Sequence, residues 1–114
     1  MPILTPPLTK KLHIAAAYAA SGNQVIIPAP SKDLEIVITS FYLQNASAIA
    51  TTAKLITNSF TFFQRLFQTQ GSDILIVNNP GMEDRLGAGQ SLTLNLSGAN
   101  SFNVDICYWL DTAI

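Results

Sequence analysis

Apolar and polar side chains alternate along several short stretches of this chain, as they do in strands that place one face on a core. The last quarter shows this best, at residues 92–96 (LTLNL) and 104–110 (VDICYWL). Residues 97–100 (SGAN) stand between the two stretches, and their types favour a turn. The pattern predicts a β-hairpin that closes a sheet.

Other stretches also predict strands. Residues 33–44 form the longest, and its alternation gives way to apolar side chains on both faces at residues 41–43 (FYL), which predicts cover on both faces. Residues 25–27 (VII) are followed by two prolines and predict an edge strand or a strand end. Residues 50–57 predict a strand rich in threonine, and residues 73–77 (DILIV) predict a buried one.

Two segments fit either a strand or a helix. Residues 12–20 are rich in alanine, which favours a helix, but no helix cap precedes them. Residues 59–70 place apolar side chains at helical spacing and nearly as well at strand spacing. The β-propensity of their aromatic residues favours a strand. We therefore predict strands in both segments.

About eight short strands follow, separated by turns at the spacing typical of sandwiches and barrels. The predicted fold class is all-β: an antiparallel two-sheet β-sandwich, jelly-roll-like, without a required helix. Residues 12–114 are expected to form this single domain.

Residues 1–11 predict an extended N-terminal arm, because three prolines among them remove backbone donors. Such a segment can fray in solution or lie on a partner. Ile3, Leu4 and Leu8 give the arm apolar side chains that suit contact with a partner.

Composition adds an expectation about association. Hydrophobic residues make up 48 % of the 114 residues and charged residues only 11 %, with a net charge of −1. Ordinary soluble domains carry about 25 % charged residues. A net charge near zero favours association. The composition therefore favours a subunit of an assembly over a monomer with a neutral polar coat, as in some lectin-like domains.

Candidate chemistry is sparse. His13 is the only histidine, and no carboxylates cluster near it in the sequence, so we expect no metal or catalytic duty. Cys107 excludes an internal disulfide, and with no visible base or helix N-terminus to activate its thiol we expect it to be inert. Glu83, Asp84 and Arg85 are most simply interpreted as a solvated loop. Metal capture by the Glu83 and Asp84 oxygens is a remote alternative, because calcium usually needs six or more ligands. We predict no catalytic residue, no cofactor and no metal.

Several functional classes lack support. Asp105 and Asp111 could serve glycoside hydrolysis only as a cleft pair, and solvated or salt-bridged positions on a strand's outer face suit them better. The chain is therefore not expected to be an enzyme. The six basic residues are scattered, so no nucleic-acid partner is expected. No signal peptide or long apolar run is apparent, so neither a membrane partner nor export by the usual route is expected.

Aromatic and apolar side chains supply the interface prediction. Trp109 falls on the polar-facing side of the last strand, where it could stack on a sugar or anchor a subunit interface. The charge-poor composition favours the interface. The predicted interface residues are Ile3, Leu4, Leu8, Phe41, Phe63, Phe67 and Trp109.

Residues 21–46, 52–57 and 87–110, in that order, resemble small β-sandwich virion proteins of tailed bacteriophages, of the capsid decoration or cement type. That group has a strand of the I-x-V-x-S-x-x-L kind after a turn, then a Gly-rich turn, an L-x-L-x-L strand and a last strand with a tyrosine. The matching positions are Ile36, Ile38, Ser40, Leu43, Leu92, Leu94, Leu96 and Tyr108. Residues 60–70 depart from the group by being longer and more aromatic.

The resemblance implies a structural part of a virus particle. Such proteins typically form trimers on the capsid exterior or serve in the tail or neck. It implies a homo-oligomer, a trimer by preference, whose partner is the major capsid protein or another virion protein. It also implies assembly in the host cytoplasm and residence in the virion, on the capsid surface by preference, with the N-terminal arm clasping the coat. A carbohydrate-binding module that uses Trp109 or Tyr42 as a stacking platform is the alternative of another class.

Overall fold

The computed structural model describes residues 11–69, 71, 73–77 and 84–113. The arm expected over residues 1–11 lies outside this part of the chain except for Lys11. Among the described residues, no helix has the length and apolar character needed to cross a membrane.

The described residues form strands and no helix. The strands are β1 (Leu12–Tyr18), β2 (Gly22–Ile27), β3 (Leu34–Asn45), β4 (Thr51–Ile56), β5 (Thr61–Phe67), β6 (Asp73–Val77), β7 (Asp84–Arg85), β8 (Leu92–Leu96) and β9 (Phe102–Thr112). The strand predictions for residues 12–20 and 59–70 are therefore confirmed, at β1 and β5.

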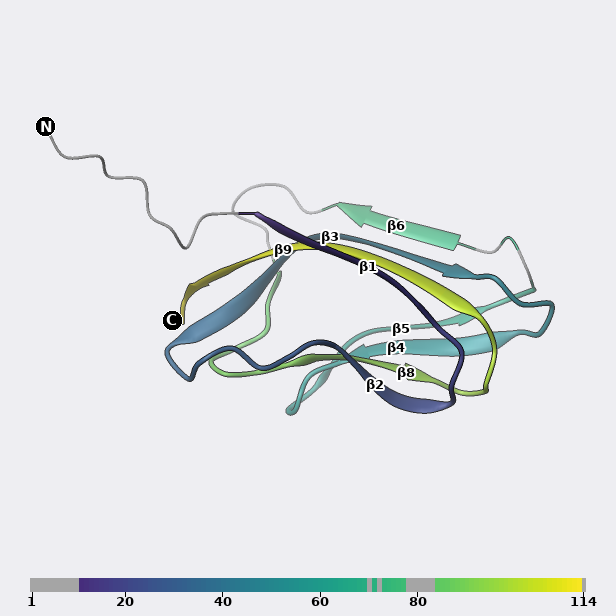
Figure 1. Cartoon of the computed structure of the whole chain (residues 1–114), viewed down its shortest axis with the longest axis horizontal. Coiled ribbons are helices and arrows are strands. Elements are labelled where there is room, and N and C mark those ends of the chain that lie inside the picture. The colour runs from purple at the N-terminus through teal and green to yellow at the C-terminus, as the bar shows by residue number, and fades with distance from the viewer. Residues whose placement is uncertain (1–10, 70, 72, 78–83, 114) are drawn as a thin grey trace, which may run out of the picture.

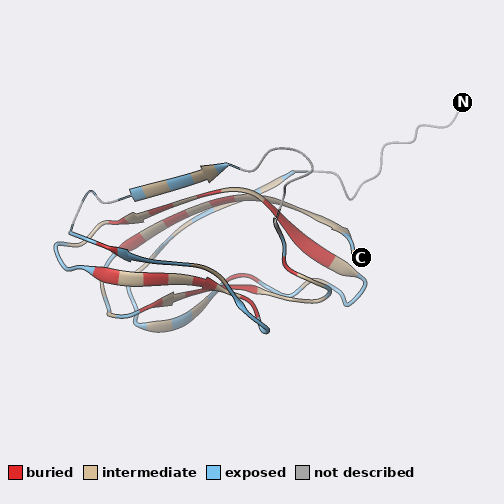
Figure 2. Ribbon diagram, turned by 180° about the vertical axis from the view of Figure 1, so that it is seen from behind, coloured by how far each residue is buried: buried red, intermediate tan, exposed pale blue. Residues whose placement is uncertain are grey.

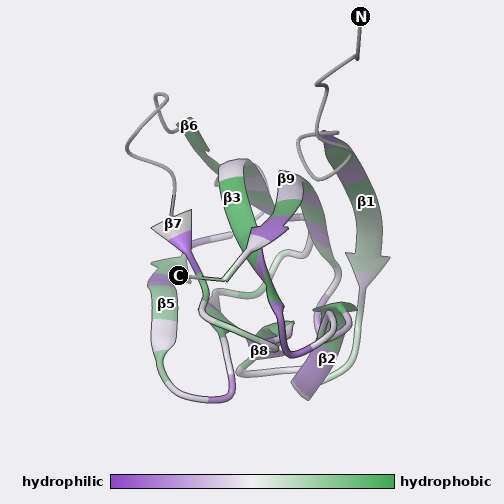
Figure 3. Ribbon diagram, turned by 90° about the vertical axis from the view of Figure 1, so that its left-hand side faces the viewer, coloured by the Kyte–Doolittle hydropathy of each residue, from purple (hydrophilic) through white to green (hydrophobic). Residues whose placement is uncertain are grey.

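The strands lie in two antiparallel sheets that face each other as two layers (Figure 1). One sheet has the order β1-β9-β3-β6, with the two-residue β7 also paired to β3. The other has the order β2-β8-β4-β5. The end view places β1 and β2 at one side of the sandwich and β5 and β6 at the other (Figure 3). This is a jelly roll with eight main strands, which confirms the predicted fold class.

The predicted hairpin of the last quarter is wrong. β8 pairs with β2 and β4, whereas β9 pairs with β1 and β3, so the connection at residues 97–101 crosses from one layer to the other. The crossing is held by Ser97, whose backbone N–H donates to Thr52 O at 3.0 Å and whose hydroxyl accepts from Thr52 N–H at 2.9 Å. Both strands still turn their apolar faces to one core, which is why their alternation resembled a hairpin.

The core lies between the layers, where the inward faces of both sheets meet (Figure 2). Phe67 of β5 and Phe102 of β9 are 0 % exposed and meet edge to face, with ring centroids 5.1 Å apart. Offset or edge-to-face aromatic pairs are favourable beyond their buried area. The pair therefore joins the two sheets near the end where β5 and β9 approach.

A β-bulge explains the residues of β3 that look apolar on both faces. The pairing with β9 shifts between Ile38 and Ser40, which leaves Thr39 as the extra residue. A bulge changes which side chains face inward. Phe41 therefore points into the core after Ile38 does, and Tyr42 takes the outer face. The expectation that both faces are covered at residues 41–43 is corrected.

The strand at residues 73–77 is present but is not buried. β6 forms an edge of its sheet, and its residues alternate between intermediate and exposed (Figure 2). Ile74 and Ile76 pack on the core, whereas Leu75 and Val77 face outward at 61 % and 65 % exposure. An apolar run therefore failed to distinguish a central strand from an edge strand.

Candidate functional site

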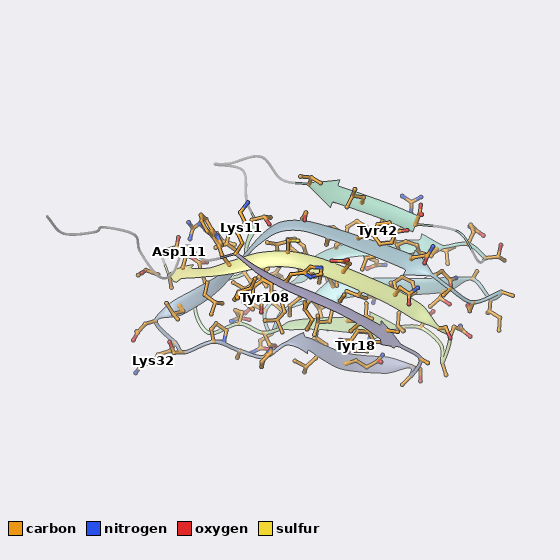
Figure 4. All side chains as sticks on the ribbon, turned by 45° about the horizontal axis from the view of Figure 1, so that its top comes forward. Lys11, Tyr18, Lys32, Tyr42, Tyr108 and Asp111 are labelled. Carbon is orange, nitrogen blue, oxygen red and sulfur yellow. The ribbon has the colours of Figure 1, made fainter. Side chains whose placement is uncertain are left out.

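The outer face of the β1-β9-β3-β6 sheet carries most of the side chains with chemistry to offer. Figure 4 looks onto this face and places Tyr42 and Asp111 toward opposite ends of it. Strand pairing sets the outward side chains in rows, because directly opposite residues point to the same side. One row joins Ala15, Asp105, Tyr42 and Leu75, and the next joins His13, Cys107, Ser40 and Val77.

A shallow groove of about 400 Å³ occupies the first of these rows and its neighbours. Its lining comes from β1, β3 and β9: Ala15, Ala16, Tyr42, Gln44, Asn103, Val104 and Asp105. The alanines of β1 are short, so the larger side chains of β3 stand above them. The groove therefore combines an aromatic wall with amide and carboxylate groups.

Two hydrogen bonds fix the polar wall of the groove. The Tyr42 hydroxyl donates to Asp73 Oδ2 at 2.9 Å, and Asn103 Nδ2 donates to Gln44 Oε1 at 3.1 Å. The bond to Asp73, helped by partial burial and by the charge of Asp73, raises the pKa of the Tyr42 phenol above its ordinary value. Tyr42 is thus held as a neutral donor beside the groove.

His13, Asp105 and Cys107 lie together on the same face. His13 of β1 stands directly opposite Cys107 of β9, and its Nε2 contacts Asp105 Oδ1. Their ligand atoms all lie within 4.8 Å of one another. No carboxylate clusters near His13 in the sequence, but β1–β9 pairing supplies one from 92 residues away.

A charged cluster lies at the opposite end of the face. Glu35 of β3 is 3 % exposed, and its Oε2 accepts from Arg85 Nη1 at 2.9 Å while its Oε1 accepts from Gly87 N–H at 3.1 Å. Arg85 Nη2 also donates to Asp111 Oδ2 at 2.9 Å. The hydrogen bond from Arg85, followed by that from the Thr112 backbone, holds the pKa of Asp111 below its usual range. Arg85 is thus an ion-pair bridge, which corrects the solvated-loop interpretation.

Of the other residues of that loop, Glu83 lies outside the described part of the chain, and for Asp84 only the backbone is described, paired to Ile38. On the outer face, Asp111 lies in a salt bridge with Arg85, as expected from the sequence, and Asp105 contacts the His13 ring.

The predicted interface residues fall into three groups: those buried in the core, those partly buried, and those outside the described residues. Phe41 and Phe67 are 3 % and 0 % exposed within a single copy, so they belong to the core and are corrected as contact residues. Phe41 packs edge to face on Phe63, with ring centroids 5.1 Å apart, and Phe63 is only partly buried. Ile3, Leu4 and Leu8 lie outside the described residues.

Trp109 lies on the outer side of β9 beside Val37, at intermediate burial. Its indole Nε1 is shielded from solvent without a hydrogen-bond partner in the described part of the structure. The ring therefore already leans on its own chain, and its role at an interface stays a prediction.

Sequence reasoning missed the apolar side chains that the structure exposes. Beyond Leu75 and Val77 of β6, these include Leu66 of β5, which is 53 % exposed, and Phe60, which precedes the first residue of β5 and is 45 % exposed. β5 and β6 are the edge strands at the same side of the sandwich. Only the strand order identifies that side, and no local pattern encodes the order.

No known family model matches the sequence, and no curated protein matches it. Among solved structures, the chain is similar to a protein of Bacillus endospore appendages, described as a novel family of disulfide-linked pili. The TM-score is 0.45 at 13 % identity, over 100 % of this chain and 99 % of that chain.

The chain is also similar to a protein of the extra small virus (XSV) virus-like particle from the giant freshwater prawn Macrobrachium rosenbergii. Here the TM-score is 0.45 at 12 % identity, over 100 % of this chain and 92 % of that chain. Neither likeness carries an argument about what this chain does.

Proposed function

We propose that this protein is a non-enzymatic structural subunit of an assembled particle, and specifically a decoration or cement protein on the capsid of a tailed bacteriophage. It acts as a homotrimer and braces the shell through apolar contacts and its N-terminal arm. Because it binds the assembled shell and not free coat subunits, it stabilises the shell by mass action.

The main support is the apolar edge of the sandwich. Leu75 and Val77 stand 61 % and 65 % exposed on β6, which ends its sheet. Exposed apolar edge strands pair readily with other chains, and proteins usually block them with charged side chains. Only 11 % of this chain is charged. An exposed apolar edge of this kind favours a protein in which another chain permanently covers that edge.

The occupant we propose for β6 is a second copy of the same chain. Outward side chains on β6 are apolar beyond Asp73, so a neighbouring copy meets no line of like charges there. The net charge of −1 also adds little repulsion between copies. The resemblance of residues 21–110 to phage virion proteins supports the finer assignment to a trimer on a capsid.

Co-sedimentation with phage particles tests the assignment. The purified chain is mixed with emptied heads, with isolated tails and with free coat protein of the phage that encodes it. We expect it to pellet with the heads and not to bind free coat subunits, and to raise the temperature at which the heads disrupt. Pelleting with tails alone would move the protein to the tail or neck, and no association with any particle would overturn the proposal.

A second candidate function rests on the groove beside Tyr42. A half-exposed aromatic wall with Gln44, Asn103 and Asp105 beside it suits a sugar ring, which takes stacking on one face and hydrogen bonds at its edge. Glycan-array binding that is lost in Tyr42→Ala but kept in Trp109→Ala would favour this function. Absence of glycan binding by the natural chain would exclude it.

A further inference from the structure

His13, Asp105 and Cys107 form a group that the proposed structural function does not use. They offer one imidazole nitrogen, one carboxylate oxygen and one sulfur, with all three atoms within 4.8 Å of one another. We propose that these three residues bind a zinc ion on the outer face of the larger sheet, with a fourth position open to solvent.

Continuous strand pairing positions the ligands. β1 and β9 pair without a break from Leu12↔Tyr108 to Tyr18↔Phe102, so His13 and Cys107 are fixed opposite each other. Directly opposite residues on one face have Cβ atoms about 4.5–5.5 Å apart. Asp105 precedes Cys107 by two residues and so shares its face. All three ligands therefore come from paired strands and none from a loop.

The donor set fits zinc. Zinc takes thiolate sulfur at about 2.3 Å, imidazole nitrogen at about 2.0–2.1 Å and carboxylate oxygen at about 2.0–2.2 Å in a tetrahedron. A tetrahedron with these bonds sets neighbouring ligand atoms roughly 3–4 Å apart. The three ligand atoms lie within 4.8 Å of one another, close to that range before any metal binds. A thiolate ligand and an imidazole ligand also favour zinc over magnesium or calcium.

Exposure decides which kind of zinc site this is. The side chains of His13 and Asp105 are 55 % and 48 % exposed, so water reaches the ion. Three protein ligands and an open position are the arrangement of sites that bind a further ligand, whereas structural sites are closed by four. Asp105 also lines the groove of Tyr42, so a ligand on the open position would lie toward the groove.

Charge balance is also favourable. A zinc ion with one thiolate, one carboxylate and one neutral imidazole has no net charge, so the loaded site itself is neutral. In the unloaded protein, Asp105 and His13 contact each other, and that contact exchanges for bonds to the metal. The competing interpretation is a plain His13–Asp105 pair beside an inert thiol.

Metal titration separates the two interpretations. The reduced, metal-free chain is titrated with Zn²⁺ by calorimetry and with Co²⁺ by absorption spectroscopy. We expect one ion per chain and, with cobalt, a thiolate-to-metal charge-transfer band together with tetrahedral ligand-field bands. The cobalt spectrum needs no variant, so it stands even if a substitution disturbs folding.

Three variants assign the ligands, with Asp33→Asn as the control because it removes an exposed carboxylate outside the cluster. Cys107→Ser should abolish the charge-transfer band. His13→Ala and Asp105→Asn should each weaken Zn²⁺ binding by at least about tenfold, since even supporting partners of a metal site are worth 10–100-fold. Asp33→Asn should bind as the natural chain does.

Absence of saturable zinc binding would overturn the site, and so would binding that survives Cys107→Ser without a cobalt–thiolate band. The outcome is independent of particle binding, because the ligands lie on β1 and β9 and not on the exposed edge at β6.

Discussion

Replacing Arg85 by methionine tests how the charged end of the sandwich is held. Methionine keeps an apolar stem of similar length but removes both hydrogen bonds that Arg85 donates, to Glu35 and to Asp111. The variant leaves Glu35 with its negative charge in a site where the side chain is 4 % exposed. Its Gly87 N–H bond remains.

The magnitude follows from these contacts. Removing one partner of a fully buried ion pair destabilises a protein by about 3–5 kcal/mol. Arg85 is 34 % exposed, and the Gly87 N–H still donates to Glu35. The loss of stability should therefore be smaller than for a fully buried pair and close to that of one hydrogen bond to a charged group, about 1.5–3 kcal/mol. The bond to Asp111, whose side chain is 33 % exposed, adds less than about 1 kcal/mol. We expect Arg85→Met to lower the free energy of unfolding by about 2–3 kcal/mol.

Urea unfolding at neutral pH and one fixed protein concentration measures the loss, since assembly would otherwise add a concentration-dependent term. Glu35→Gln/Arg85→Met removes the buried charge with its partner and should recover at least half of the loss. Lys32→Met, at an exposed position, is the control and should change the free energy of unfolding by less than about 0.5 kcal/mol. If Arg85→Met behaves like Lys32→Met, or if the double variant is the least stable, the reasoning is refuted.

Three further predictions concern single side chains. The pKa of Asp111 is lowered by Arg85, so its charge stabilises the fold above the ordinary carboxyl pKa near 4, and this is lost as the pH falls through the lower folded-state value. Asp111→Asn should therefore have a lower melting temperature than the natural chain at neutral pH, and the difference between the two melting temperatures should be smaller at about pH 2–3. A difference that grows in acid would contradict this. Asp73→Ala removes both the hydrogen bond and the charge, so it should lower the raised pKa of Tyr42 toward its ordinary value in an ultraviolet titration of the phenolate; an unchanged pKa would exclude Asp73 as the cause. Phe67→Ala should cost about 3–5 kcal/mol in urea unfolding, because the ring is fully buried, and a loss below about 1 kcal/mol would contradict its place in the core.

Much of the fold could be predicted because burial on one face imposes a period of two. Residues 92–96 and 104–110 alternate for that reason, and both are strands. The period does not say which strand is the neighbour, so a crossing between layers and a hairpin look alike in the sequence. The pairing is decided by the whole set of strands that share the core.

The bulge at Thr39 shows a second limit. One extra residue in β3 moves Phe41 inward, where sequence reasoning placed it at an interface. Nothing in the local residue types marks the insertion, because the bulge is defined against the partner strand β9. The error therefore came from register and not from hydrophobicity.

The candidate sites were missed for the same reason. His13 and Cys107 are 94 positions apart in numbering and meet only through the register of β1 on β9. Arg85 reaches Glu35 because β7 pairs with β3. A sequence-level signal existed only in the residue types themselves, a lone histidine and a lone cysteine each on a predicted strand.

The proposed function requires that the exposed apolar edge at β6 is covered in solution by other copies. Sedimentation equilibrium of the purified chain over a wide range of concentrations tests it directly. Leu75→Lys, which puts a charge on that edge, is compared with Ser31→Lys in the exposed loop before β3. We expect a trimer for the natural chain and for Ser31→Lys, and dissociation for Leu75→Lys. A natural chain that stays monomeric at every concentration would contradict it.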